Sequence, residues 1–200
     1  MPNQRRAAYS MSGTGLIFIG GGFILAAISS LFPSQGLSLL GLVITAVGIV
    51  LFFMEWSAFT PSERRFSAYG AGLYIIALIA SVLVGASLFT VNYTSHSLFH
   101  SGSPLAAPLQ AVGDGFTGIL LYLSFLLFPY AFARREEKTM LLVGFVGGFI
   151  VAVVLNPIAI GGSLYNITNI SGLVRLVTDI VSLIFGVSYL VIGNNVRIRR

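Results

Sequence analysis

Six long runs of apolar residues restrict the possible folds of this chain more than any other feature. A helix of ~20 such residues crosses the roughly 30 Å hydrocarbon core of a bilayer. The runs are continuous and lack the alternation of a barrel strand, so helices are the way to pair their backbone groups in lipid. We therefore predict one all-helical transmembrane domain over residues 1–200, with six helices at about 13–32, 37–54, 69–91, 115–133, 140–160 and 172–193.

The balance of residue types agrees with a membrane location. Apolar residues make up 56% of the 200 residues and charged residues only 8%, whereas soluble domains carry about 25% charged residues. A soluble protein of this composition would expose large apolar patches. The first run, from Gly15 to Phe32, is longer than the apolar part of a signal peptide and has no clear cleavage site, so we expect an uncleaved helix.

The segments between the helices fall into two sets by charge. One set is basic, and the other contains no lysine or arginine at all. Because basic segments face the cytoplasm, we expect a cell-membrane protein with both termini cytoplasmic and its longest outer loop at about 92–114. The basic set contains Arg5, Arg6, Arg64, Arg65, Arg134 to Lys138, Arg197, Arg199 and Arg200, and the other set is Pro33–Gly36, Asn92–Asp114 and Gly161–Ser171.

The predicted outer segments contain two kinds of candidate site. Glycosylation sequons begin at Asn92, Asn166 and Asn169, although Ser, Thr and Asn also simply favour polar loops. His96 and His100 are four residues apart and could share a metal ion on a helical turn, with Asp114 as a third ligand. The alternative is a pair of solvated loop histidines.

Arg175 and Asp179 are the only opposite charges within one predicted span. A charge inside the membrane costs at least about 2.5 kcal/mol unless it is paired or faces protein. The i,i+4 spacing places both on one face of a helix, where they can form an ion pair. Such a pair orients the last helix toward the bundle, or alternatively serves as a proton relay or a substrate counter-charge.

Glycine and proline mark further positions in the predicted helices. Gly144, Gly147 and Gly148 cluster in the helix at 140–160, and small residues let membrane helices approach closely. They are candidate packing residues, either within this chain or against another subunit. Pro129 and Pro157 interrupt the backbone hydrogen bonds of their helices, which favours a kink or a helix end.

The inventory of reactive residues argues against catalysis and bound cofactors. The chain has no cysteine, and neither histidine lies in a predicted helix, which excludes thiolate sites and a bis-histidine haem. Serines in the membrane have no histidine to activate them, and the only lysine, Lys138, lies in a predicted cytoplasmic loop. The net charge of +5 occurs in small clusters without interleaved aromatics, so we expect no nucleic-acid partner. We predict a protein that is not an enzyme.

The residue composition of the helices and loops follows one pattern along the whole sequence. Helices rich in Gly, Ile and Leu alternate with arginine-bearing inner loops and with outer loops of Ser, Thr and Asn, and Phe66-Ser67-Ala68-Tyr69-Gly70-x-Gly72 leads into the third helix. In this the sequence resembles uncharacterised multi-pass membrane proteins of about this length from archaea. The resemblance implies a multi-pass membrane protein and carries over no functional residue.

Two functions fit these observations. The first is a non-catalytic membrane subunit or scaffold that sits among lipids and packs laterally with partner subunits or with copies of itself. The second is a small transporter or channel that uses Arg175 and Asp179. Ser81-x-x-x-Gly85-x-Ser87 recurs as Ser182-x-x-x-Gly186-x-Ser188. This is either a faint internal repeat of the kind common in transporters or a chance match of three common residues in two apolar helices, and chance is the preferred interpretation.

Overall fold

The computed structural model of the protein describes residues 2–32, 35–84, 106–158 and 170–198. Over these residues the chain has six long helices and no strand, in agreement with the predicted all-helical class. The elements in chain order are α1 (Pro2–Leu31), α2 (Gln35–Phe53), the 3₁₀ turn η1 (Trp56–Ala58), α3 (Pro61–Val84), α4 (Ala106–Tyr130), α5 (Arg135–Ile150), the π-helical turn η2 (Val151–Leu155) and α7 (Ile170–Ile198).

Most helices extend beyond their predicted bounds. α1 begins at Pro2 rather than near residue 13, and α7 runs to Ile198 rather than 193. α4 begins at Ala106, so residues 106–114 are helical and do not belong to the outer loop predicted at 92–114. Hydropathy marks only the part of a helix that suits hydrocarbon, and polar turns continue the same helix beyond it.

The first turn of α3 shows how a polar sequence starts a helix before the apolar run. α3 begins at Pro61, eight residues ahead of the predicted start at Tyr69. The Thr60 N–H donates to the Glu63 carboxylate at 2.7 Å, and the Glu63 N–H approaches the Thr60 hydroxyl at 3.4 Å. This is a capping box, with proline at the first helical position. The T-x-x-E pattern was readable in the sequence.

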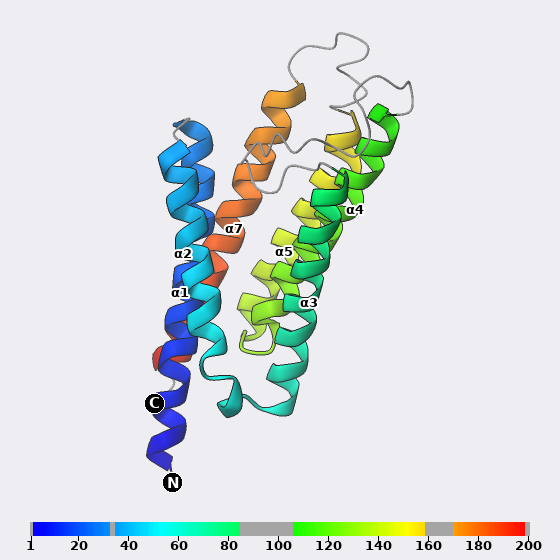
Figure 1. Ribbon diagram of the computed structural model, residues 1–200. Coiled ribbons are helices and arrows are strands. Elements are labelled where there is room, and N and C mark those ends of the chain that lie inside the picture. The colour runs from blue at the N-terminus through cyan, green and yellow to red at the C-terminus, as the bar shows by residue number, and fades with distance from the viewer. Residues whose placement is uncertain (1, 33–34, 85–105, 159–169, 199–200) are drawn as a thin grey trace.

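The helices form two groups of three (Figure 1). In the first group, α1 packs along both α2 and α7, and in the second, α4 packs along both α3 and α5. Contacts between α5 and α7 join the groups. The two ends of the chain lie at the same end of the bundle (Figure 1).

Glycines bring α1 into backbone contact with α7. A Cβ atom on Gly13 would lie 2.6 Å from the Gly193 carbonyl oxygen, and a Cβ on Gly20 would lie 2.7 Å from the Gly186 carbonyl oxygen. The two pairs are two helical turns apart, which keeps them on one face of each helix. Any larger residue would push the backbones apart, so these positions require glycine.

A second face of α1 meets α2 in the same way. A Cβ on Gly15 would lie 2.6 Å from the Gly48 carbonyl oxygen, and a Cβ on Gly22 would lie 2.8 Å from that of Gly41. We call the α1–α7 and α1–α2 contacts the glycine seams. In membranes, where lipid is as apolar as the side chains, such close backbone approach is a main source of helix association.

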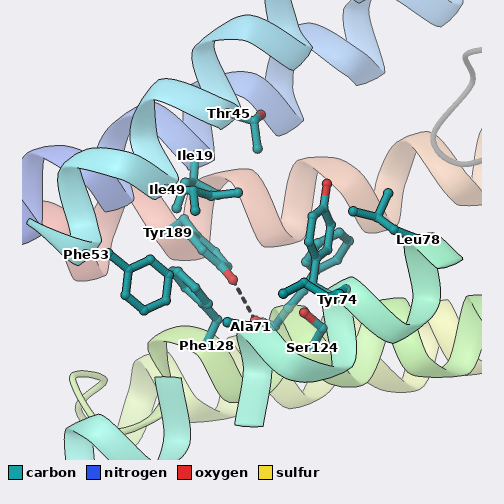
Figure 2. Close-up of a pocket in the computed structure, with 12 residues that line it drawn as sticks. Ile19, Thr45, Ile49, Phe53, Ala71, Tyr74, Leu78, Ser124, Phe128 and Tyr189 are labelled. Atoms are coloured by element: carbon teal, nitrogen blue, oxygen red, sulfur yellow. Dashed lines mark hydrogen bonds between the residues drawn. The ribbon is translucent and has the colours of Figure 1, made fainter. Parts of the chain in front are cut away.

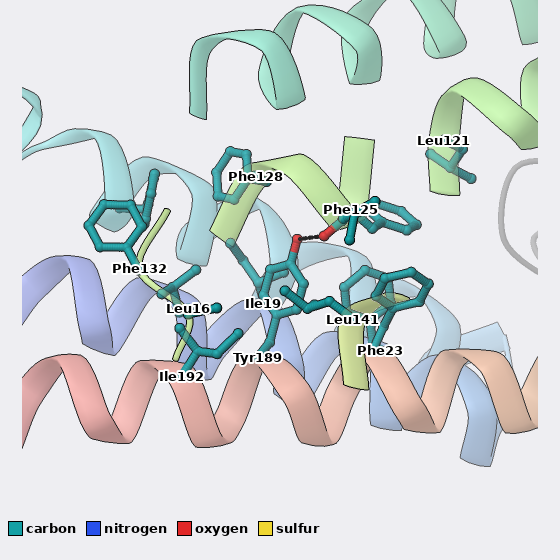
Figure 3. Close-up of a cluster of buried hydrophobic side chains, with 14 of the residues drawn as sticks. Leu16, Ile19, Phe23, Leu121, Phe125, Phe128, Phe132, Leu141, Tyr189 and Ile192 are labelled. Carbon is teal, nitrogen blue, oxygen red and sulfur yellow. Dashed lines mark hydrogen bonds between the residues drawn. The ribbon is translucent and has the colours of Figure 1, made fainter. Parts of the chain in front are cut away.

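Aromatic side chains fill the space between the two groups, and a hydrogen bond from Tyr189 crosses it (Figure 3). Pro129 in α4 has no N–H, so the carbonyl of Phe125, four residues earlier, lacks its usual helical donor. The Tyr189 hydroxyl of α7 donates to that carbonyl at 2.9 Å. Tyr189 is fully buried, so α7 supplies the hydrogen bond that the proline removes from α4.

Candidate functional site

The two charges predicted as an intramembrane pair have different surroundings. Asp179 accepts a hydrogen bond from the Ser30 hydroxyl of α1. Arg175 is exposed, and in the described part of the chain it forms no ion pair with Asp179. Ser30 lies in the last turn of α1, which ends at Leu31. Asp179 is therefore level with the end of a neighbouring helix and links α7 to α1, a role that the i,i+4 spacing did not predict.

At the opposite end of the bundle, Glu55 links the turn that follows α2 to helix α1. Its carboxylate accepts hydrogen bonds from the Ser12 N–H at 2.7 Å and the Ser12 hydroxyl at 2.6 Å, and a longer one from the Met11 N–H at 3.3 Å. Ser12 is fully buried. The carboxylate is thus held by α1, and it fixes where α2 ends relative to α1.

Two other carboxylates at this end make similar links. Glu63 of α3 accepts a hydrogen bond from the Tyr9 hydroxyl of α1 at 3.2 Å. Glu137 of α5 accepts one from the Arg134 N–H at 2.7 Å and another from the Asn195 side chain of α7. Glu137 is 4% exposed and its hydrogen bonds offset the cost of burying a charge. These links between helices join residues far apart in the chain, so no local sequence pattern predicted them.

The glycine cluster of α5 faces the interior of this chain. A Cβ on Gly144 would meet Phe185 of α7 at 3.2 Å, and one on Gly147 would meet Val181 of α7 at 2.9 Å. A Cβ on Gly148 would overlap the Tyr122 ring of α4 at 2.3 Å. Of the two alternatives for these residues, the structure supports packing within the chain. A substitution of Gly148 would therefore disturb the fold and not a contact with another subunit.

A cavity of about 280 Å³ lies between the two helix groups, where α2 and α3 diverge (Figure 2). α2 and α3 are consecutive in the chain but do not pack closely along their lengths. Ile49 and Phe53 of α2 form one wall, and Ala71, Ile75 and Leu78 of α3 form the other. The floor comes from α1, α4 and α7, through Ile19, Ser124, Phe125, Phe128 and Tyr189.

The polar side chains in this wall are mostly satisfied by the protein itself. The Thr45 hydroxyl donates to the Gly41 carbonyl at 2.9 Å, and the Ser124 hydroxyl donates to the Gly70 carbonyl at 2.8 Å. Tyr189 donates to Phe125, as described above. Tyr74 reaches from α3 toward α2 across the cavity (Figure 2). The cavity therefore presents hydrocarbon and aromatic surface rather than groups that would hold a polar substrate.

Several predicted sites fall outside the described residues. His96 and His100 of the candidate metal site, and the sequons at Asn92, Asn166 and Asn169, all lie there. The backbone of Asp114 belongs to α4, but its side chain is not described. Within the described residues, the structure contains no cluster of metal-ligating side chains.

Three of the described helical segments are long and apolar enough to cross a membrane. They are Tyr9–Leu31, Arg135–Ile158 and Gly172–Ile198, and the shorter apolar segments Leu39–Phe53 and Gly115–Tyr130 accompany them. The findings agree with a membrane-associated helical protein. Comparisons of the chain with models of protein families, with curated proteins and with solved structures found no match.

Proposed function

We propose that the chain crosses the cell membrane six times, with both termini in the cytoplasm. Three long apolar segments and two shorter ones support this proposal, as does the position of both ends of the chain at one end of the bundle (Figure 1). α3 completes the set, because it lies alongside α4 and its residues from Ala71 to Ile79 are mostly apolar. The basic segments determine the orientation.

The orientation can be tested on a background free of native thiols, since the chain has no cysteine. A cysteine at Ser62, in the exposed first turn of α3, should resist an impermeant maleimide added to intact cells. Cysteines at Ser101 and Ser163 should react. Labelling of the Ser62 variant in intact cells would reverse the orientation, and its labelling only after permeabilisation is the expected result.

We further propose that the protein is a non-catalytic subunit that packs laterally against other membrane proteins or copies of itself. The observation that carries this proposal is the outer face of α5. Only 28% of the span containing α5 is buried, against 50% for the α1 span and 44% for the α7 span. The exposed face is apolar and consists of Leu142, Val143, Val146, Phe149, Ile150 and Val153.

The interior of the protein explains why this face is the one to test. Glycines could bring helices of different subunits together, but most glycines of α1, α5 and α7 already contact other helices of this chain. A partner must therefore use an outward face, and α5 offers the largest one among the three long apolar segments. The transport alternative has less support, because neither Arg175 nor Asp179 lines the cavity and Asp179 is engaged by Ser30.

The test is the size of the assembly in mild detergent, measured by mass photometry for matched variants. Val146→Trp adds bulk on the outer face of α5, and Val47→Trp makes the same change on the exposed face of α2. We expect a wild-type particle larger than one chain, a smaller particle for Val146→Trp and no change for Val47→Trp. A wild-type protein that is monomeric, with no protein recovered alongside it, would contradict the proposal.

A further inference from the structure

The cavity between α2 and α3 is continuous with the apolar outer surface of the bundle. Ile75 lines the cavity and is also 55% exposed, and its neighbours Ile76 and Ile79 are exposed as well. Val43, Val47 and Val50 form a similar exposed surface on α2. In a chain that spans a bilayer, as proposed above, this opening faces the hydrocarbon of the lipid.

The shape and chemistry of the cavity favour a hydrocarbon chain as its occupant. A transmembrane helix is ~10 Å wide and associates through small residues, whereas this cavity holds about 280 Å³ and is walled mainly by isoleucine, leucine and aromatic side chains. Water needs several polar partners to occupy a cavity, and the Thr45, Ser124 and Tyr189 hydroxyls already donate within the protein. A flexible hydrocarbon chain needs neither the space of a helix nor the polar partners that water requires.

A second observation places a cation in line with the cavity. Arg64 lies on the same face of α3 as Ala71, Ile75 and Leu78, because those residues follow it by two, three and four helical turns. The Arg64 guanidinium donates to the Ser57 carbonyl of η1 at 2.6 Å, across the corner that joins α2 to α3. The side chain is exposed, and a guanidinium has five donors, so it can also bind a phosphate.

We infer that the cavity binds one hydrocarbon chain of a phospholipid whose phosphate lies at Arg64. Along α3, Arg64 is ~10 Å from Ala71, at 1.5 Å per residue. The aromatic side chains of Phe52, Phe53, Phe59 and Phe128 pack together between the cavity and η1, with Phe52 and Phe128 centroids 4.5 Å apart. The hydrocarbon chain of the lipid therefore enters from the side, between α2 and α3, on the side of this aromatic layer that faces away from η1. The headgroup stays beside η1, near Arg64.

The experiment measures how much dioleoyl phosphatidylglycerol the purified protein retains in mild detergent, by native mass spectrometry. The wild type should bind one molecule in a saturable way. Ala71→Phe fills the cavity and should weaken retention roughly tenfold, the equivalent of about 1.4 kcal/mol, with a smaller loss for Ala71→Leu. Gly72→Phe is the control, because no atom lies within 4 Å of a Cβ at Gly72 and this position lies about 100° around α3 from Ala71. It should retain lipid as the wild type does.

A second pair of matched variants tests the contact between the lipid headgroup and Arg64. Arg64→Gln should weaken retention about threefold, since it removes a charge-assisted contact, whereas Arg65→Gln, one residue away on a different face of the helix, should not. Thermal unfolding confirms that each variant is folded, and Ala71→Leu carries the test if Ala71→Phe does not fold. Lipid binding that never saturates, or equal losses for Gly72→Phe and Ala71→Phe, would overturn the inference. Neither result depends on assembly size or on labelling of Ser62.

Discussion

α1 and α2 meet through glycines, whereas α2 and α3, the next pair along the chain, diverge around a cavity. At the glycine seams the backbones touch, with Gly15 against Gly48 and Gly20 against Gly186. Between α2 and α3 the facing residues are large, such as Phe53, Ile75 and Leu78. Large residues keep helix axes apart and leave space wherever their shapes do not interlock, while small residues let the backbones close.

This difference shows that neighbours in sequence need not be neighbours in space. α1 packs as extensively on α7, at the other end of the chain, as on α2. The first group is thus closed by the last helix, and the second group is joined to it mainly through α5 and the Tyr189 hydrogen bond. We expect substitutions in the seams to cost more than substitutions around the cavity.

The largest effect is expected at a seam. Gly48→Leu would force the α1 and α2 backbones apart, because a Cβ there already lies 2.7 Å from the Gly15 carbonyl oxygen. Overpacking that the backbone must absorb costs about 3 kcal/mol, measured by reversible unfolding in detergent. Gly21→Leu is the control, since no atom lies within 4 Å of a Cβ at Gly21. Equal losses for the two variants would remove the distinction between seam and surface.

A smaller effect is expected at the hydrogen bond that joins the groups. Tyr189→Phe removes the buried hydrogen bond to the Phe125 carbonyl, at a position where Pro129 supplies no N–H, and losing a buried hydrogen bond costs about 1.5 kcal/mol. Tyr74→Phe, at a half-buried side chain that lines the cavity, should be nearly neutral. In a Pro129→Ala background the restored N–H should reduce the cost of Tyr189→Phe. An unchanged cost there would show that the proline is not the reason for the bond.

The smallest effect is expected where α1 ends. Ser30→Ala and Asp179→Asn should each destabilise the protein by about 1 kcal/mol, and together by less than the sum, because they share one hydrogen bond. The Arg175→Gln and Asp179→Asn changes should instead add independently. Double-mutant cycles of unfolding free energy measure both couplings. Strong coupling between Arg175 and Asp179 would restore the ion pair predicted from their spacing.

Helices were predictable from the sequence because long apolar runs have few alternatives in a chain with so few charges. Hydropathy did not place their starts, since Thr60, Pro61 and Glu63 begin α3 through a capping box in a segment that hydropathy assigns to a loop. α4 likewise begins at Ala106, inside the segment predicted as the outer loop. At α3, local polar chemistry rather than apolar length decides where the helix begins.

The candidate site was less predictable, because it depends on contacts between residues far apart in the chain. Gly20 and Gly22 were visible as small residues, but nothing local shows that Gly186 and Gly41 face them. Ser30 is likewise remote in sequence from Asp179. A cavity arises from what side chains fail to fill, and periodicity along one helix carries no information about that.

The face of α1 that bears Leu16 and Phe23 is buried, whereas the space between α2 and α3 opens to the apolar outer surface of the bundle. The most direct test is photolabelling in proteoliposomes with a small apolar carbene reagent that dissolves in the bilayer, read residue by residue by mass spectrometry. We predict labels on Ile75, 55% exposed, and on Leu78 in the cavity wall, with none on Leu16 or Phe23 of α1, which are 0% and 2% exposed. Labelling of Leu16 and Phe23 as strong as that of Ile75 would contradict both the burial of this face of α1 and the opening between α2 and α3.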